Sequence, residues 1–134
     1  MQKETLVHVR ESREEHLLRP AAIVGLLGIA LIHFLDLFSK FKETPYLGVS
    51  YLGLIAACIA ASVLLLRHDA RHGWLLSAIA SGATMLGFLL SRTTGLPGAR
   101  GDIGNWTEPL GLASLFVEAA VLAGSLYVLT RIRR

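Results

Sequence analysis

The chain has a single cysteine among 134 residues and very few charges within four long parts of its length. Because Cys58 is the only cysteine, the chain cannot form an internal disulfide. The same count excludes the C-x-x-C pair of membrane thiol oxidoreductases and zinc sites made of several cysteines. Cys58 lies among alanines, where a free thiol behaves as a small buried hydrophobe. We therefore interpret Cys58 as a packing residue.

The parts with few charges are four apolar stretches, residues 21–38, 47–66, 74–90 and 109–129. Each is close to the roughly 20 residues that a helix, rising about 1.5 Å per residue, needs to cross a hydrocarbon layer about 30 Å thick. A segment inside lipid must satisfy its backbone hydrogen bonds internally, as a helix does. The sequence therefore predicts an all-α fold, an integral membrane four-helix bundle with up-down topology. Short turns are expected after the first and second spans.

We expect a single transmembrane domain at residues 21–130, between a charged, amphipathic tail (1–20) and a basic tail (131–134). Pro20 is expected at the first position of helix one, where proline is favoured. Residues 1–20 are charged throughout and lack the apolar core of a secretory signal peptide. The first span is therefore expected to act as an uncleaved signal.

The lysines and arginines predict how the chain is oriented. Nine of the 13 flank the side that holds both tails and the second turn, and four lie on the other side. The positive-inside rule then predicts a multi-pass protein of the plasma membrane with both termini in the cytoplasm. With a pI near 9.4, these cations favour anionic lipid headgroups as partners, and no pattern indicates nucleic-acid binding. The nine are Lys3, Arg10, Arg13, Arg19, Arg67, Arg71, Arg131, Arg133 and Arg134.

The connection at residues 91–108, SRTTGLPGARGDIGNWTE, is 18 residues long and is predicted to lie outside the cell. Loops above about 12 to 15 residues are uncommon without a function or disorder. Its glycines suit turns, whereas Ile103 and Trp106 are apolar anchors that a disordered linker does not need. The sequence favours an ordered cap over a linker. The candidate cap or interaction residues are Arg92, Pro97, Asp102, Asn105, Trp106 and Glu108.

Several strings in the chain are similar to those of a known group of proteins. SRTTGLPG, DIGNWTEPLG and SLFVE, together with HFLDLFSKFKETPYLG, resemble small four-helix membrane proteins of actinobacterial type. The resemblance covers about residues 21–130 and implies the four-span architecture. It supplies no activity, cofactor or catalytic residue.

Three ionisable residues lie inside the predicted spans: His33 and Asp36 on helix one and Glu118 on helix four. Ionisable side chains in lipid cost several kcal/mol, about 2.5 to 3.5 for a charged group on insertion scales, and usually face the bundle interior. The helical rise places Glu118 and His33 at similar depths, so they are expected to pair or to leave Glu118 neutral. Two interpretations stay open: a buried polar network and a proton or cation site. Asp36 has a third interpretation, an ion pair near the membrane surface with Lys40 or Arg92.

No metal or cofactor is required by the sequence. His33, Asp36 and Glu118 offer at most three metal ligands, and no second histidine lies in a span to complete a bis-histidine haem. Small and hydroxylated residues also recur at helical spacing on all four helices. They predict either close packing with hydrogen bonds between helices or a polar pocket in the outer half of the bundle, closed by the loop 91–108.

These observations leave three function classes. The first is a non-catalytic accessory or partner-binding subunit of a membrane complex that uses the loop 91–108, with other membrane proteins as partners. The second is a small proton-coupled transporter or cation-binding protein that uses Glu118 with His33 and Asp36. The third is a quinone- or redox-linked protein, which an absorbance spectrum of the purified protein would reveal. No catalytic constellation is recognisable, so an enzyme is not favoured.

Overall fold

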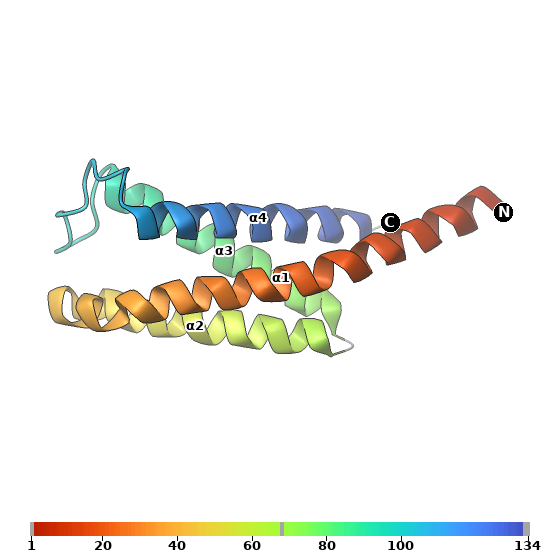
Figure 1. Ribbon diagram of the computed structural model, residues 1–134, viewed down its shortest axis with the longest axis horizontal. Helices are drawn as coiled ribbons and strands as arrows, with labels where there is room; N and C mark the ends of the chain where they lie inside the picture. The colour runs from red at the N-terminus through yellow and green to blue at the C-terminus, as the bar shows by residue number, and fades with distance from the viewer. Residues whose placement is uncertain (1, 68, 133–134) are drawn as a thin grey trace.

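A computed structural model describes residues 2–67 and 69–132, with the side chains of 7–12 and 132 excepted. It contains four helices: α1 (Gln2–Glu43), α2 (Pro45–Leu66), α3 (Ala70–Arg92) and α4 (Pro109–Ile132) (Figure 1). Each helix packs against its neighbours in sequence, and α4 closes the bundle against α1. All four are long and apolar enough to cross a membrane. The chain is a multi-pass, all-α four-helix bundle, which confirms the predicted fold class.

The helices extend beyond the apolar stretches that predicted them. Thr44 alone separates α1 from α2, and only residues 67–69 separate α2 from α3, of which 68 lies outside the described residues. Two features favour this extension at the first turn. Lys40 and Lys42 in the last turn of α1 complement the negative end of its helix dipole, and Pro45 fits the first position of α2. The basic tail's Arg133 and Arg134 also lie outside the described residues.

Helix α1 does not start at Pro20, so the prediction that placed Pro20 at its first position was wrong. The helix runs for 42 residues with Pro20 inside it. Proline in a helix removes one backbone hydrogen bond and disturbs the preceding turn. Contacts on both sides offset this cost. In the part of α1 before Pro20, Trp74 of α3 donates from Nε1 to Glu15 (3.3 Å), and Tyr127 of α4 donates to Glu14.

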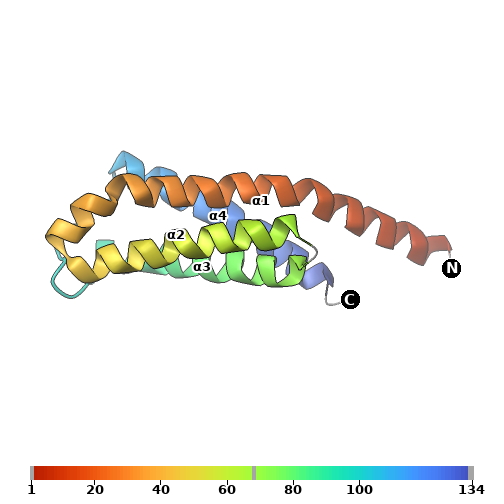
Figure 2. The same cartoon turned by 90° about the horizontal axis from the view of Figure 1, so that it is seen from below.

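The N-terminal part of α1 projects beyond the bundle at the end where the chain terminates (Figures 1 and 2). The half of the bundle next to this end holds a tight apolar core. Leu26, Ile29, Leu65 and Trp74 are completely buried there, around Cys58. Trp74 thus packs in the core against α1, and its hydrogen bond to Glu15 links α3 to the part of α1 before Pro20.

The buried hydroxyl groups do not link neighbouring helices, contrary to the expectation of interhelical hydrogen bonds. Most of those in the described residues donate to a carbonyl about one turn earlier in their own helix, as Ser62 does to Cys58 (2.8 Å) and Ser81 to Ser77 (2.6 Å), while Ser114 donates to the side chain of Glu118 on its own helix. The i−4 carbonyl is always within reach, so a hydroxyl is satisfied without a partner on another helix. Ser77, Thr84 and Ser125 follow the same pattern. These residues therefore matter for helix packing mainly because their side chains are small and let the helices approach closely.

Candidate functional site

The loop between α3 and α4 is folded around the side chain of Arg92. This side chain is only 7% exposed at the end of α3. Its Nε donates to the carbonyl of Asn105 (2.8 Å), its Nη2 to Glu108 Oε2 (3.0 Å), and its Nη1 lies 3.6 Å from Asp102 Oδ2. The guanidinium also stacks on Phe88, 4.5 Å from the ring centroid. One buried cation therefore holds three separate points of the loop.

Further contacts tie the loop to α1 and α2. Lys40 of α1 reaches Asp102 (Nζ to Oδ2, 3.6 Å), and Tyr46 of α2 donates to the carbonyl of Pro97 (2.5 Å). Trp106 contacts the ring of Phe88 edge-on, with centroids 6.1 Å apart. Despite this contact, the side chain of Trp106 is 42% exposed. The loop thus contacts α1, α2 and α3 as well as α4, whose first residue it precedes.

The turns of this loop depend on glycine at three positions. Gly95, Gly98 and Gly104 have positive φ angles of 80°, 69° and 78°, a region in which side chains with a Cβ are strained. At Gly95 an added Cβ would also lie 2.9 Å from Ile103 Cδ1. The fourth expected turn residue, Gly101, has no positive φ.

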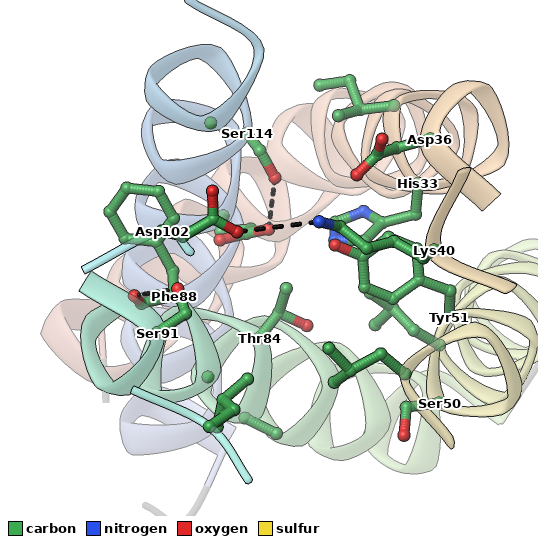
Figure 3. A pocket seen from close by; sticks show the side chains of 18 of the residues that line it. His33, Asp36, Lys40, Ser50, Tyr51, Thr84, Phe88, Ser91, Asp102 and Ser114 are labelled. Carbon is green, nitrogen blue, oxygen red and sulfur yellow. Dashed lines mark hydrogen bonds and ion pairs between the residues drawn. The ribbon is translucent and has the colours of Figure 1, made fainter. Parts of the chain in front are cut away.

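Beneath the loop, the structure contains a cavity of about 820 Å³. All four helices and the loop line it, at the end of the bundle opposite the apolar core. Small side chains leave this space open. Gly53 of α2 and Gly87 of α3 face it, and a Cβ added at either would meet no atom within 4 Å. Figure 3 shows Asp36, His33 and Tyr51 on one side of this space, with Ser114 on the other.

Glu118 lies on the wall of this cavity and is 1% exposed. Ser114, one turn earlier in α4, donates a hydrogen bond of 2.5 Å to its Oε1. Its other oxygen has no hydrogen-bond partner among residues 2–67 and 69–132. Glu118 therefore has one oxygen held by its own helix and one available to a ligand.

His33 lies on α1, is 7% exposed, and lines the same cavity. Its Nδ1 is 2.8 Å from the carbonyl oxygen of Ile29. Because a carbonyl can only accept, Nδ1 carries a proton and Nε2 is the acceptor of the neutral ring. The ring also packs edge-on against Tyr51, with centroids 4.8 Å apart. Within the described residues, no ion pair joins His33 to Glu118; both instead face the cavity separately.

Asp36 also lines the cavity and is half-buried. The expected ion pairs of Asp36 with Lys40 or Arg92 do not form in the described part of the chain. Lys40 contacts Glu43 (3.4 Å) and Asp102, and Arg92 contacts Asp102 and Glu108. Lys40 and Arg92 therefore form their ion pairs with carboxylates at the loop end of the cavity. Asp36 is left as a carboxylate without an ion-pair partner there.

Sequence reasoning identified His33, Asp36 and Glu118 but missed two aromatic walls of the same space, Tyr51 and Phe88. Tyr51 is only two residues from Gly53, and residues two apart on a helix do not share a face, so the spacing gave no signal that its ring lines the cavity. Among the described residues, no three His, Cys, Asp or Glu side chains gather as a metal-binding group.

Comparison of the chain with protein-family models, with curated proteins and with solved structures finds no match. The fold and the lining of the cavity therefore carry the functional argument. The resemblance to small four-helix membrane proteins of actinobacterial type stays an expectation.

Proposed function

We propose that this protein binds a small solute in the cavity under the loop 93–108, as a carrier or receptor of the membrane. The observation that supports this most strongly is a space of about 820 Å³ that contains two carboxylates, Asp36 and Glu118, without ion-pair partners in the described chain. Ligand sites commonly measure about 300 to 1,000 Å³ and combine apolar walls with a few polar groups. Close packing alone does not account for an open space beside two carboxyl groups, since protein interiors are otherwise close-packed.

Thiol labelling tests whether the cavity is open to water. We expect Ala83→Cys, which places a thiol on the cavity wall of α3, to react with a small hydrophilic methanethiosulfonate applied outside sealed vesicles. The background is Cys58→Ala. The matched control is Ile59→Cys, which lies on the outer surface of α2 and is not part of the cavity, and which should stay unlabelled in lipid. Equal, slow labelling of both positions would mean that the cavity is closed and dry, and would contradict the proposed function.

For this function, we propose that the cavity opens to the cell exterior and that both termini are cytoplasmic in the plasma membrane. Support comes from the nine to four distribution of lysine and arginine and from the even number of helices. In a Cys58→Ala background, we expect Arg100→Cys to be labelled by an impermeant maleimide on intact cells. Ala70→Cys should be labelled only after permeabilisation. The reverse pattern would invert the proposed topology.

A second candidate function is that of an accessory subunit whose outer loop binds another membrane protein. Its support is the exposure of two apolar side chains on the loop, Ile103 at 46% and Trp106 at 42%. Aromatic side chains of this kind are enriched at protein interfaces. The two functions use opposite faces of the loop, because the cavity lies beneath it. A partner on the outer face is therefore compatible with solute binding below.

A further inference from the structure

We propose that the ligand of this cavity is an amphiphilic organic monocation, an inference that rests on the proposed solute-binding function. The charges of the lining support this class. Five carboxylates line the cavity, against two cationic side chains and one histidine. Both cations are already engaged by carboxylates, Lys40 by Glu43 and Asp102, and Arg92 by Asp102 and Glu108. An anionic ligand would find no free cation and would meet the field of the remaining carboxylates.

Two carboxylates lie deeper than these ion pairs. Asp36 on α1 has no ion-pair partner in the described chain, and Glu118 on α4 presents one oxygen without a hydrogen bond. Figure 3 shows Asp36 on α1 and Ser114, the hydrogen-bond donor to Glu118, on the neighbouring α4, both pointing into the same space. A charge removed from water is costly unless it is paired. A single positive charge placed between α1 and α4 would supply that partner.

The remaining walls favour a bulky, apolar body around the charge. Aliphatic residues from all four helices face the cavity. The rings of Tyr51 and Phe88 also line it, and an aromatic ring attracts a cation through its π face. Arg92 already stacks on Phe88 in this way. A bare metal ion is a poorer fit, since the described residues provide no group of three His, Cys, Asp or Glu ligands. The lining thus combines a negative centre with apolar and aromatic surroundings. This is the chemistry that recognises quaternary ammonium or phosphonium compounds.

A pair of probes of matched shape and opposite charge tests this class. We expect tetraphenylphosphonium to bind the purified full-length protein in nanodiscs saturably, with one site per chain and at least about tenfold more tightly than tetraphenylborate. Isothermal titration against empty nanodiscs removes the contribution of partitioning into lipid. Asp36→Asn and Glu118→Gln should each weaken phosphonium binding by about tenfold or more, because each removes a charge that faces the cation.

Cavity-filling variants separate failure of the ligand class from failure of the proposed function. Gly53→Leu with Gly87→Leu reduces the cavity from two walls on which an added Cβ meets no atom within 4 Å, and Gly124→Leu adds the same side chain at an equally open position outside the cavity. Loss of phosphonium binding in the filled variant alone supports the proposal. If tetraphenylborate binds saturably and the filled variant abolishes this binding, the proposed cationic ligand class is overturned, while the proposal that the cavity binds a solute still stands. If neither probe binds saturably, or if filling changes nothing, both the class and the cavity as its site are refuted.

Discussion

Glu118→Gln is expected to abolish most of the pH dependence of cation binding while leaving the fold intact. The ionised carboxylate attracts a cation and a proton alike, so binding should weaken as the pH falls and Glu118 takes up a proton. Glutamine has nearly the same shape, and its carbonyl oxygen can still accept the hydrogen bond from Ser114. We therefore expect a loss of at least about tenfold in phosphonium affinity at neutral pH and less than about 1 kcal/mol change in stability.

The measurement is a series of phosphonium titrations over a range of pH values, together with thermal unfolding in the same nanodiscs. Other titratable groups line the cavity as well. They are His33, Asp36, Lys40 and Glu43 on α1, Tyr46 and Tyr51 on α2, Arg92 on α3, and Asp102 and Glu108 of the loop. Asp36→Asn is therefore measured in parallel, and the double variant should retain little pH dependence. Asp69→Asn is the control, since this carboxylate is 53% exposed, pairs with His72 and is not part of the cavity lining. If the Glu118→Gln protein shows the wild-type pH profile of binding, Glu118 does not contribute to the cation site.

Arg92→Met is expected to release the loop between α3 and α4 and to destabilise the protein by about 2 kcal/mol. Methionine keeps an unbranched apolar stem but removes all hydrogen bonds to Asn105, Glu108 and Ser91. Hydrogen bonds to charged groups contribute about 1.5 to 3 kcal/mol, and the two released carboxylates are partly exposed, so water can solvate them. Backbone amides of residues 93–108 should then exchange with solvent much faster.

Hydrogen exchange with mass spectrometry measures this loop directly, and thermal unfolding measures the stability. Arg100→Met is the matched control, because Arg100 belongs to the same loop but is exposed. It should change the exchange rates of the loop little. If amides of the wild-type loop already exchange as fast as those at the start of α1, the loop is a linker and Arg92 does not order it.

The sequence by itself determined the number of helices, their order and their apolar character. Each stretch such as 47–66 is long enough to span a bilayer, and a chain in lipid has no alternative to the helix there, because its backbone groups must bond internally. The sequence also indicated that Glu118 belongs in the interior, since ionisable side chains avoid lipid. It indicated turns in the loop after α3, where three glycines do adopt positive φ angles.

Only the tertiary structure decided how the polar residues are paired. Lys40 is one helical turn from Asp36, but it contacts Asp102, which lies 62 positions further along the chain. The positions of His33 and Glu118 along their helices predicted that both lie at the same depth in the membrane. The orientation of α1 and α4 about their own axes, which the sequence does not give, directs both side chains into the cavity and not toward one another. The tertiary structure likewise brings Glu14 and Glu15, in the part of α1 before Pro20, into contact with α4 and α3. Spacing along a helix fixes which side chains share a face, whereas the partner of each face depends on packing between helices, which no local pattern encodes.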